Sequence, residues 1–198
     1  MVKIFYFILI FSIITEVTSY QQQQEEEEDC IVETECPEGW RKFNRKMGAW
    51  CISLVVNGVK SQKEAQVNCE RMGATLSGIE SQGEYSYVQY KGNQINKNLN
   101  EVTWLWIGGK RRSECLSPKG SAAECQPMAN NAFEWSDGVA VGTSQMRWAA
   151  GQPDNFRGNE DCLHMQFDQA QRNGVMNDYP CDQVAGGYLC GKRASILE

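Results

Sequence analysis

The sequence predicts an α+β domain that is held together by disulfide bonds. Two amphipathic helical segments lie early in the chain, and short apolar segments separated by Gly, Asn, Asp and Pro lie around and after them. Helices that precede a run of short, largely antiparallel strands are typical of this fold class. The 198 residues include nine cysteines, so we expect disulfide bonds to compensate for long irregular loops.

The N-terminus has the layout of a secretory signal peptide. Lys3 precedes an apolar run from Ile4 to Ile14, and Thr18 and Ser19 follow that run. A helix needs about 20 apolar residues to cross a bilayer, and no segment of this chain is apolar for that long. We therefore expect residues 1–19 to be removed and the protein to be secreted without membrane insertion. An uncleaved membrane anchor is the alternative.

A polar, disordered leader rich in Gln and Glu is predicted over residues 20–35. Glu25 to Glu28 and Asp29 supply five negative charges of a formal net charge of -6, and such a tract buries no apolar surface. The rest of the chain is nearly neutral and has no basic stripe, so nucleic acid is not an expected partner. Residues 36–193 are long enough for one domain with its own core, and residues 194–198 form a short tail.

A first helix is predicted over Ser61–Met72. Ser61 and Glu64 form a capping box at its start. Gly73 is expected to end it. Its apolar face combines residues at helical spacing: Ala65, Cys69 and Met72.

A second helix is predicted to begin at Ser81, which forms a capping box with Glu84. Tyr85 and Val88 make its apolar stripe, and Gly92 is expected to close it. The segment between the helices, GATLSGIES, predicts a short extended link against the core.

Short strands or strand ends are predicted after the helices. Each consists of a few apolar residues bounded by turn-forming residues. The segments are TWLWIGG (103–109), AFEWSDG (132–138), MRWAAGQ (146–152), CLHMQF (162–167) and GGYLCG (186–191).

Acidic residues crowd together in the stretch GQPDNFRGNEDC, residues 151–162. Asp154, Glu160 and Asp161 lie in a segment rich in Gly, Asn and Pro, with Arg157 as its only cation. Like charges at this spacing repel unless solvent, a proton or a cation separates them. The stretch is therefore either a solvated loop or a binding site for a cation.

The chain from Cys36 to Lys192 resembles a C-type lectin-like domain. Motifs of that family occur here in family order: CPEGW, the helical Cys69, TWLWIGG, WSDG, QPD, NEDC, ND before a cysteine, and YLC. Each motif is weak by itself, whereas their order and spacing together are specific. The resemblance implies the C-type lectin-like fold, with two helices, short antiparallel sheets and a long loop region.

The resemblance also implies a disulfide framework: Cys36 with Cys51, Cys69 with Cys190, and Cys162 with Cys181. Two further cysteines, Cys115 and Cys125, lie outside it in an insertion, where a local pair is the simplest arrangement. Cys30 then remains as the odd cysteine, either free or in a disulfide-linked dimer.

A calcium ion is the implied cofactor. In the family, the principal sugar-binding calcium is held at the positions that match Gln152, Asp154, Glu160, Asn177 and Asp178, and each carries the expected oxygen here. Calcium takes six to eight oxygen ligands, which leaves coordination sites for two hydroxyls of a sugar. Asp161 is not expected among the ligands.

The order of amide and acid implies the type of sugar. A coordinated hydroxyl donates to a carboxylate and accepts from an amide NH2, so the order of amide and acid in the tripeptide sets the direction of the hydrogen bonds. In the family, Gln before Asp, as in Gln152 and Asp154 here, is associated with galactose and N-acetylgalactosamine. The reversed Glu-Pro-Asn order is associated with mannose. Pro153 lies where the family has a cis peptide bond, which is accessible for X-Pro. Phe156 either stacks on the sugar or packs on the loop.

Two departures from the family pattern are visible. Met176 replaces a common Trp before the ND pair, which is expected to loosen the ligand loop. Lys110, Arg111 and Arg112 follow TWLWIGG, where the family's second, structural calcium uses acids. We therefore expect no second calcium site.

The expected function is that of a secreted lectin that binds galactose-type glycans, and the family suggests a setting in innate immunity. Two other functions are possible for the same residues. Clustered acids can serve an enzyme, but no nucleophile accompanies them, and His164, the only histidine, lies on a predicted strand as a structural residue. The stronger rival is a calcium-independent module that binds protein, lipid or a surface. Loss of a ligand usually marks such modules, and none is lost here.

Overall fold

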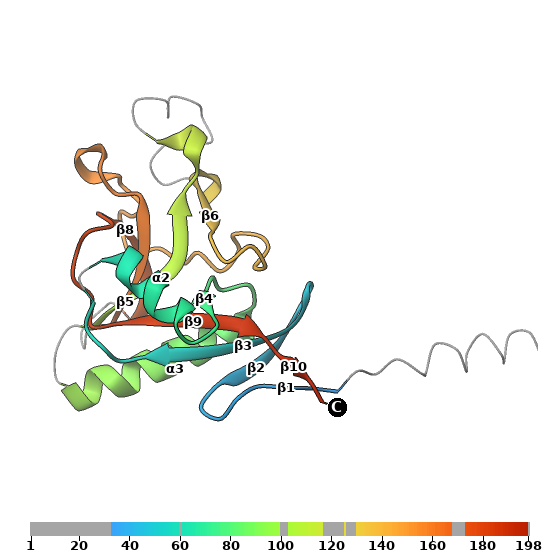
Figure 1. Cartoon of the computed structure of the whole chain (residues 1–198). Helices are drawn as coiled ribbons and strands as arrows, with labels where there is room; N and C mark the ends of the chain where they lie inside the picture. The colour runs from blue at the N-terminus through green and yellow to red at the C-terminus, as the bar shows by residue number, and fades with distance from the viewer. Residues whose placement is uncertain are drawn as a thin grey trace, which may run out of the picture. The chain divides into compact units, whose positions relative to one another are not determined.

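The computed structural model describes residues 33–59, 61–99, 103–116, 125, 130–167 and 173–197 (Figure 1). The predicted signal peptide, the leader up to residue 32 and Cys30 lie outside the described residues. The chain divides into two units, residues 1–34 with 196–198 and residues 35–195.

Ordered backbone occupies the end of the predicted leader and the predicted tail. Strands β1 (Thr34–Glu35) and β10 (Ser195–Ile196) form a two-stranded sheet. In the smaller unit, the backbone N–H of Leu197 donates to the carbonyl of Glu33 at 3.0 Å. Both segments are therefore paired strands where a disordered leader and a short tail were expected.

The larger unit is built on one eight-stranded sheet, in the order β2-β3-β9-β5-β7-β8, with β4 added beside β9 and β6 beside β5. All its neighbouring strands are antiparallel except β5 and β9. The strands are β2 (Arg41–Arg45), β3 (Gly48–Val55), β4 (Thr75–Leu76), β5 (Thr103–Arg111), β6 (Phe133–Trp135), β7 (Cys162–Phe167), β8 (Asn173–Tyr179) and β9 (Gly187–Arg193). The predicted α+β class is confirmed.

Helix α2 (Gln62–Glu70) starts where the sequence predicts. The Ser61 hydroxyl accepts a hydrogen bond from the backbone N–H of Glu64 at 3.0 Å, and Gly73 follows the helix at φ +63°. The predicted apolar face is wrong at its end. Met72 lies beyond the last helical residue, so it leaves the register of the buried Ala65 and Cys69 and is 37% exposed.

Helix α3 (Gln82–Leu99) is longer than the sequence predicts, because Gly92 does not end it. A Cβ at Gly92 would overlap the ring of Phe167 on β7. This glycine therefore permits close packing of helix on sheet and does not serve as a helix stop. The start is confirmed, with Ser81 accepting from the N–H of Glu84 at 3.2 Å.

The two helices pack on opposite faces of the sheet (Figure 1). Side chains alternate between faces along a strand. On β5, Leu105 joins the core that contains Tyr85 and Val88 of α3, whereas the next residue, Trp106, joins the core of α2. Neither described helix is long and apolar enough to cross a membrane.

The structure contains the four expected disulfides: Cys36–Cys51, Cys69–Cys190, Cys115–Cys125 and Cys162–Cys181. Of the predicted strands, MRWAAGQ differs from the prediction. It forms an isolated bridge between Trp148 and Met176, because only the backbones of Arg147 and Ala149 bond to Met176 before the chain turns away at Gly151.

Candidate functional site

The pairing of β7 with β8 brings the two groups of predicted ligands together. Leu163 lies opposite Asp178 in the antiparallel register, so the residues just before β7 lie beside the end of β8. The Cys162–Cys181 disulfide connects the same two segments, with its Cα atoms 5.1 Å apart. Glu160, Asn177 and Asp178 are therefore neighbours, although 16 positions separate Glu160 from Asn177 in the chain.

Three carboxylates converge at this place. Asp154, Glu160 and Asp178 each offer an oxygen, and these oxygens lie within 4.8 Å of one another. Two oxygens that share one calcium ion, each about 2.3 to 2.6 Å from it, lie at most about 5 Å apart. Asp154 is exposed, whereas Glu160 and Asp178 are buried. The arrangement is compatible with one ion that is reached from solvent past Asp154.

Burial makes the ionised form of two of these groups costly. It raises the pKa of Glu160 to about 7, with the nearby charges of Asp178 and Asp154 adding to the rise and a hydrogen bond from the N–H of Phe156 opposing it. Burial also raises the pKa of Asp178, against hydrogen bonds from the N–H groups of Asn155 and Asp154. A bound divalent cation would stabilise the ionised form of both carboxylates.

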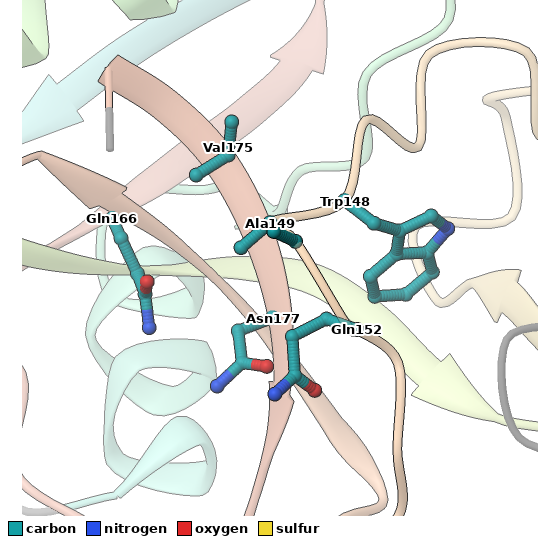
Figure 2. Close-up of a pocket in the computed structure, with 7 residues that line it drawn as sticks. Trp148, Ala149, Gln152, Gln166, Val175 and Asn177 are labelled. Atoms are coloured by element: carbon teal, nitrogen blue, oxygen red, sulfur yellow. The ribbon is translucent and has the colours of Figure 1, made fainter. Parts of the chain in front are cut away.

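Gln152 contacts the carboxylate cluster through its Oε1 atom, which accepts from the backbone N–H of Asp154 at 3.1 Å. Figure 2 shows the side chains of Gln152 and Asn177 next to each other. The Oδ1 atom of Asn177 is buried and has no hydrogen-bond partner in the part of the chain that the structure describes. Because buried carbonyl oxygens normally have a partner, this one is suited to a cation. The bond between Gln152 and Pro153 is cis, as the resemblance implied.

Backbone hydrogen bonds fold the loop around the buried acids. The Asp178 carboxylate accepts from the N–H groups of Asp154 at 3.1 Å and Asn155 at 2.9 Å. The Glu160 carboxylate accepts from the N–H of Phe156 at 2.7 Å. The acids therefore position the loop as well as offering oxygens to a cation.

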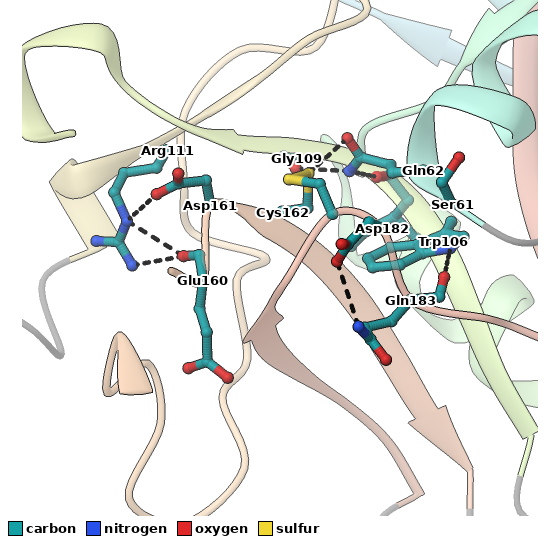
Figure 3. Close-up of a disulfide and its surroundings, with 12 residues drawn as sticks. Ser61, Gln62, Trp106, Gly109, Arg111, Glu160, Asp161, Cys162, Asp182 and Gln183 are labelled. Carbon is teal, nitrogen blue, oxygen red and sulfur yellow. Dashed lines mark hydrogen bonds and ion pairs between the residues drawn. A yellow bond between two sulfur atoms is a disulfide. The ribbon is translucent and has the colours of Figure 1, made fainter. Parts of the chain in front are cut away.

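Arg111 is the residue that sequence reasoning missed. Its Nη2 donates to Asp178 Oδ2 at 2.9 Å and to the carbonyl oxygen of Glu160 at 2.8 Å, and its Nε donates to Asp161 Oδ1 at 3.1 Å. Figure 3 shows the guanidinium reaching Asp161 and the Glu160 backbone. The group is buried and lies 4.4 Å from the ring centroid of Phe133.

The register of β5 on β7 explains this position. Lys110 lies opposite Cys162, and the N–H of Arg111 donates to the carbonyl of Asp161 at 2.8 Å. The sequence shows three adjacent cations, but only the register shows which one turns inward. Lys110 is exposed, and Arg112 is paired at the surface with Glu114 and Glu134.

The remaining predicted residues occupy distinct environments. Phe156 is 58% exposed, and the guanidinium of Arg157 in the same loop lies 5.0 Å from its ring centroid, so the ring is open to solvent and also contacts the loop. Met176 is fully buried in the core next to the bridge with Trp148. His164 is buried and stacks on Tyr179, with ring centroids 4.7 Å apart, which agrees with a structural role.

Comparison of the sequence with protein families and curated proteins identifies relatives. Residues 40–192 match the family described as C-type lectin domain-containing protein 141/158. Ladderlectin of Oncorhynchus mykiss is 25% identical over 147 residues, which cover 74% of this chain and 63% of ladderlectin. The low affinity immunoglobulin epsilon Fc receptor of Homo sapiens is 29% identical over 81% of this chain, which spans 39% of the receptor. The chain thus spans less than two thirds of these relatives.

Solved structures share the fold. The C-type lectin CEL-I from Cucumaria echinata superposes with a TM-score of 0.57 at 23% identity, covering 82% of this chain and 99% of CEL-I. A calcium-independent type II antifreeze protein gives a TM-score of 0.56 at 19% identity, covering 84% of this chain and all of that one. At these identities the likeness shows the fold alone, and it confirms the expected one.

Proposed function

The chain belongs to the family of C-type lectin domain-containing protein 141/158, and on this premise we propose that it is a calcium-dependent carbohydrate-binding protein. The observation that carries the proposal is the convergence of Asp154, Glu160 and Asp178, whose oxygens lie within 4.8 Å of one another. The buried Oδ1 atom of Asn177, which has no hydrogen-bond partner among the described residues, supports it independently.

Five residues would hold the ion: Gln152, Asp154, Glu160, Asn177 and Asp178. When bound, calcium offers its remaining coordination sites to two neighbouring hydroxyls of a sugar. The carboxylates of Asp154 and Glu160 would accept hydrogen bonds from those hydroxyls. The amide NH2 groups of Gln152 and Asn177 donate to the hydroxyl oxygens.

We propose galactose and N-acetylgalactosamine as the preferred sugars. Gln152 and Asp154 present the amide and the acid in the order associated with these sugars. The exposed ring of Phe156 is accessible to the apolar face of a sugar, on which aromatic side chains stack favourably. The partners would be glycans with such terminal residues, bound without catalysis by a protein that the N-terminal layout directs to secretion.

A calcium-independent binding module on the same fold is the second candidate. Arg111 favours it, because its guanidinium already neutralises Asp178 and satisfies the Glu160 carbonyl without a metal ion. A calcium-independent type II antifreeze protein shares this fold. The raised pKa of Glu160 and the Oδ1 atom of Asn177, which lacks a partner among the described residues, favour calcium-dependent binding, because Arg111 compensates neither.

Affinity chromatography tests the proposal. The purified protein is loaded on galactose and mannose resins with calcium and then eluted with chelator. We expect retention on galactose resin that is lost with chelator, and a rise in melting temperature on addition of calcium. Retention on neither resin, with no calcium effect on melting, would reject the lectin function.

A charge-conserving double variant tests the sugar preference. Gln152→Glu with Asp154→Asn exchanges the amide and the acid without changing the net charge of the site. We expect the preference to move from galactose to mannose resin, with chelator elution retained. An unchanged preference would show that the order of amide and acid does not set selectivity in this protein.

A further inference from the structure

A cavity of about 290 Å³ adjoins the candidate calcium site. Figure 2 shows the residues that line it, drawn from β7, β8 and the segment before the QPD motif. Those used in the following argument are Trp148, Ala149, Gln152, Gln166, Val175 and Asn177.

The cavity exists because one face of the sheet edge carries small side chains. Gln166 lies opposite Val175 in the β7–β8 register, so the two share a face of the sheet. The backbone of Arg147 to Ala149 runs beside Met176 as a further edge segment. At that edge Ala149 and the next residue, Ala150, are too small to fill the space over Val175.

Two residues belong both to this cavity and to the candidate calcium site. Gln152 and Asn177 are expected ligands, and both line the cavity. A sugar held by the calcium ligands would therefore lie at the mouth of the cavity, with a substituent directed along these two amides. The three carboxylates, Asp154, Glu160 and Asp178, are not among the described residues that line the cavity.

We propose that this cavity is a subsite for a second, neutral sugar unit, linked to the sugar that calcium holds. The inference rests on the proposed calcium-dependent sugar binding and names the class of glycan that the same site selects. The protein would thus bind disaccharide ends of glycans better than single sugars.

The chemistry of the lining supports a sugar ring. Gln152 and Gln166 place amide groups at the cavity, with Gln166 Nε2 also lying 3.0 Å from His164 Nε2, whereas Val175, Ala149 and Trp148 offer apolar surface to the C–H face of a pyranose. None of the described residues that line the cavity is charged, so none of them compensates a sialic acid or a sulfate. The cavity's volume of about 290 Å³ lies just below the range of about 300 to 1,000 Å³ of small-ligand pockets, so it suits one ring at most.

A cavity-filling variant tests the inference. Val175→Phe places a large side chain in the cavity without altering a calcium ligand. Val184→Phe is the matched control, because Val184 is 66% exposed and does not line the cavity. Calorimetry in calcium would compare methyl galactoside and methyl mannoside with neutral disaccharides ending in each sugar, and with a sialylated disaccharide.

We expect at least one neutral disaccharide to bind the wild-type protein about tenfold more tightly than its methyl glycoside, and the sialylated one to gain nothing. Val175→Phe should abolish the disaccharide gain while calcium and methyl glycoside affinities stay within twofold, and Val184→Phe should preserve it. A disaccharide gain that survives Val175→Phe, or an equal gain for the sialylated sugar, would overturn the subsite. If Val175→Phe does not fold, Ala149→Leu serves as the filling variant. Binding of no sugar at all by the wild-type protein would overturn the proposed function itself.

Discussion

The side chain of Arg111 connects β5 to Glu160 and Asp161, in the loop that carries candidate calcium ligands. It is the cation that faces the buried Asp178, and it also bonds to Asp161 and to the backbone of Glu160. A buried carboxylate that loses its partner is strongly destabilising, because its charge remains without compensation. Arg111 is therefore expected to hold the loop in shape before calcium binds.

Substitution of Arg111 by Met tests this role. In chelator, we expect Arg111→Met to lower the free energy of unfolding by about 3 kcal/mol, as is typical when a buried ion pair loses one member. Urea denaturation measures the loss. Arg112→Met is the control, because Arg112 pairs only at the surface, and it should change stability by less than about 0.5 kcal/mol. Equal effects of the two variants would contradict the role of Arg111.

The sequence predicts the ligand residues at this scale but not their surroundings. Gln152, Asp154 and Glu160 stand in one short motif, so their residue types could be interpreted directly. The inward turn of Arg111 depends on the register between β5 and β7, which no local pattern encodes. For the same reason, exposure of Phe156 became known only from the structure.

Local sequence encodes where helix α3 starts, whereas packing against the sheet determines how far it continues. Its start follows from Ser81, whose hydroxyl accepts from the backbone N–H of Glu84, a local signal. Its continuation past Gly92 depends on Phe167, which is distant in the chain and lies against the helix. Gly92 therefore allows close packing on Phe167. In the sequence alone, a glycine at this position looks like the end of a helix.

Two glycine variants of α3 test this role. Gly92→Ala should lower the free energy of unfolding by about 1 to 3 kcal/mol, the usual cost of overpacking, since its Cβ meets the Phe167 ring. Gly83→Ala, in the same helix, meets only ordinary contacts and should be neutral or stabilising by up to about 1 kcal/mol. Thermal or urea denaturation measures both. A stabilising Gly92→Ala would show that the helix does not pack on Phe167 as described.

For the molecule as a whole, the buried acids connect folding stability to pH and to calcium. The folded-state pKa of Glu160 lies near 7, above the ordinary value of 4.5. Between these two values the folded state binds more protons than the unfolded state, so without calcium stability falls as pH rises. Calcium competes with the proton for the same carboxylate, and its effect should therefore grow over this range.

Melting temperatures from pH 5 to pH 8, with calcium and with chelator, test this connection. We expect the stabilisation by calcium to be small at pH 5 and to increase through pH 7. Glu160→Gln should strongly reduce both the calcium effect and the fall of stability with pH in chelator, with Asp178, whose pKa burial also raises, accounting for any remaining fall. A calcium effect that is constant across this range would contradict the raised pKa of Glu160.

The sequence by itself determined the fold class, the two helix starts, the disulfide pairs and the five candidate ligands, because capping boxes, turn residues and ordered motifs act locally or follow a family pattern. Only the tertiary structure determined which residues are neighbours in space. It buried Glu160 and Asp178, turned Arg111 toward them, and left a cavity beside Gln152 and Asn177. These features depend on the register of strands far apart in the chain, and side-chain packing between them has no signature in any short stretch of sequence.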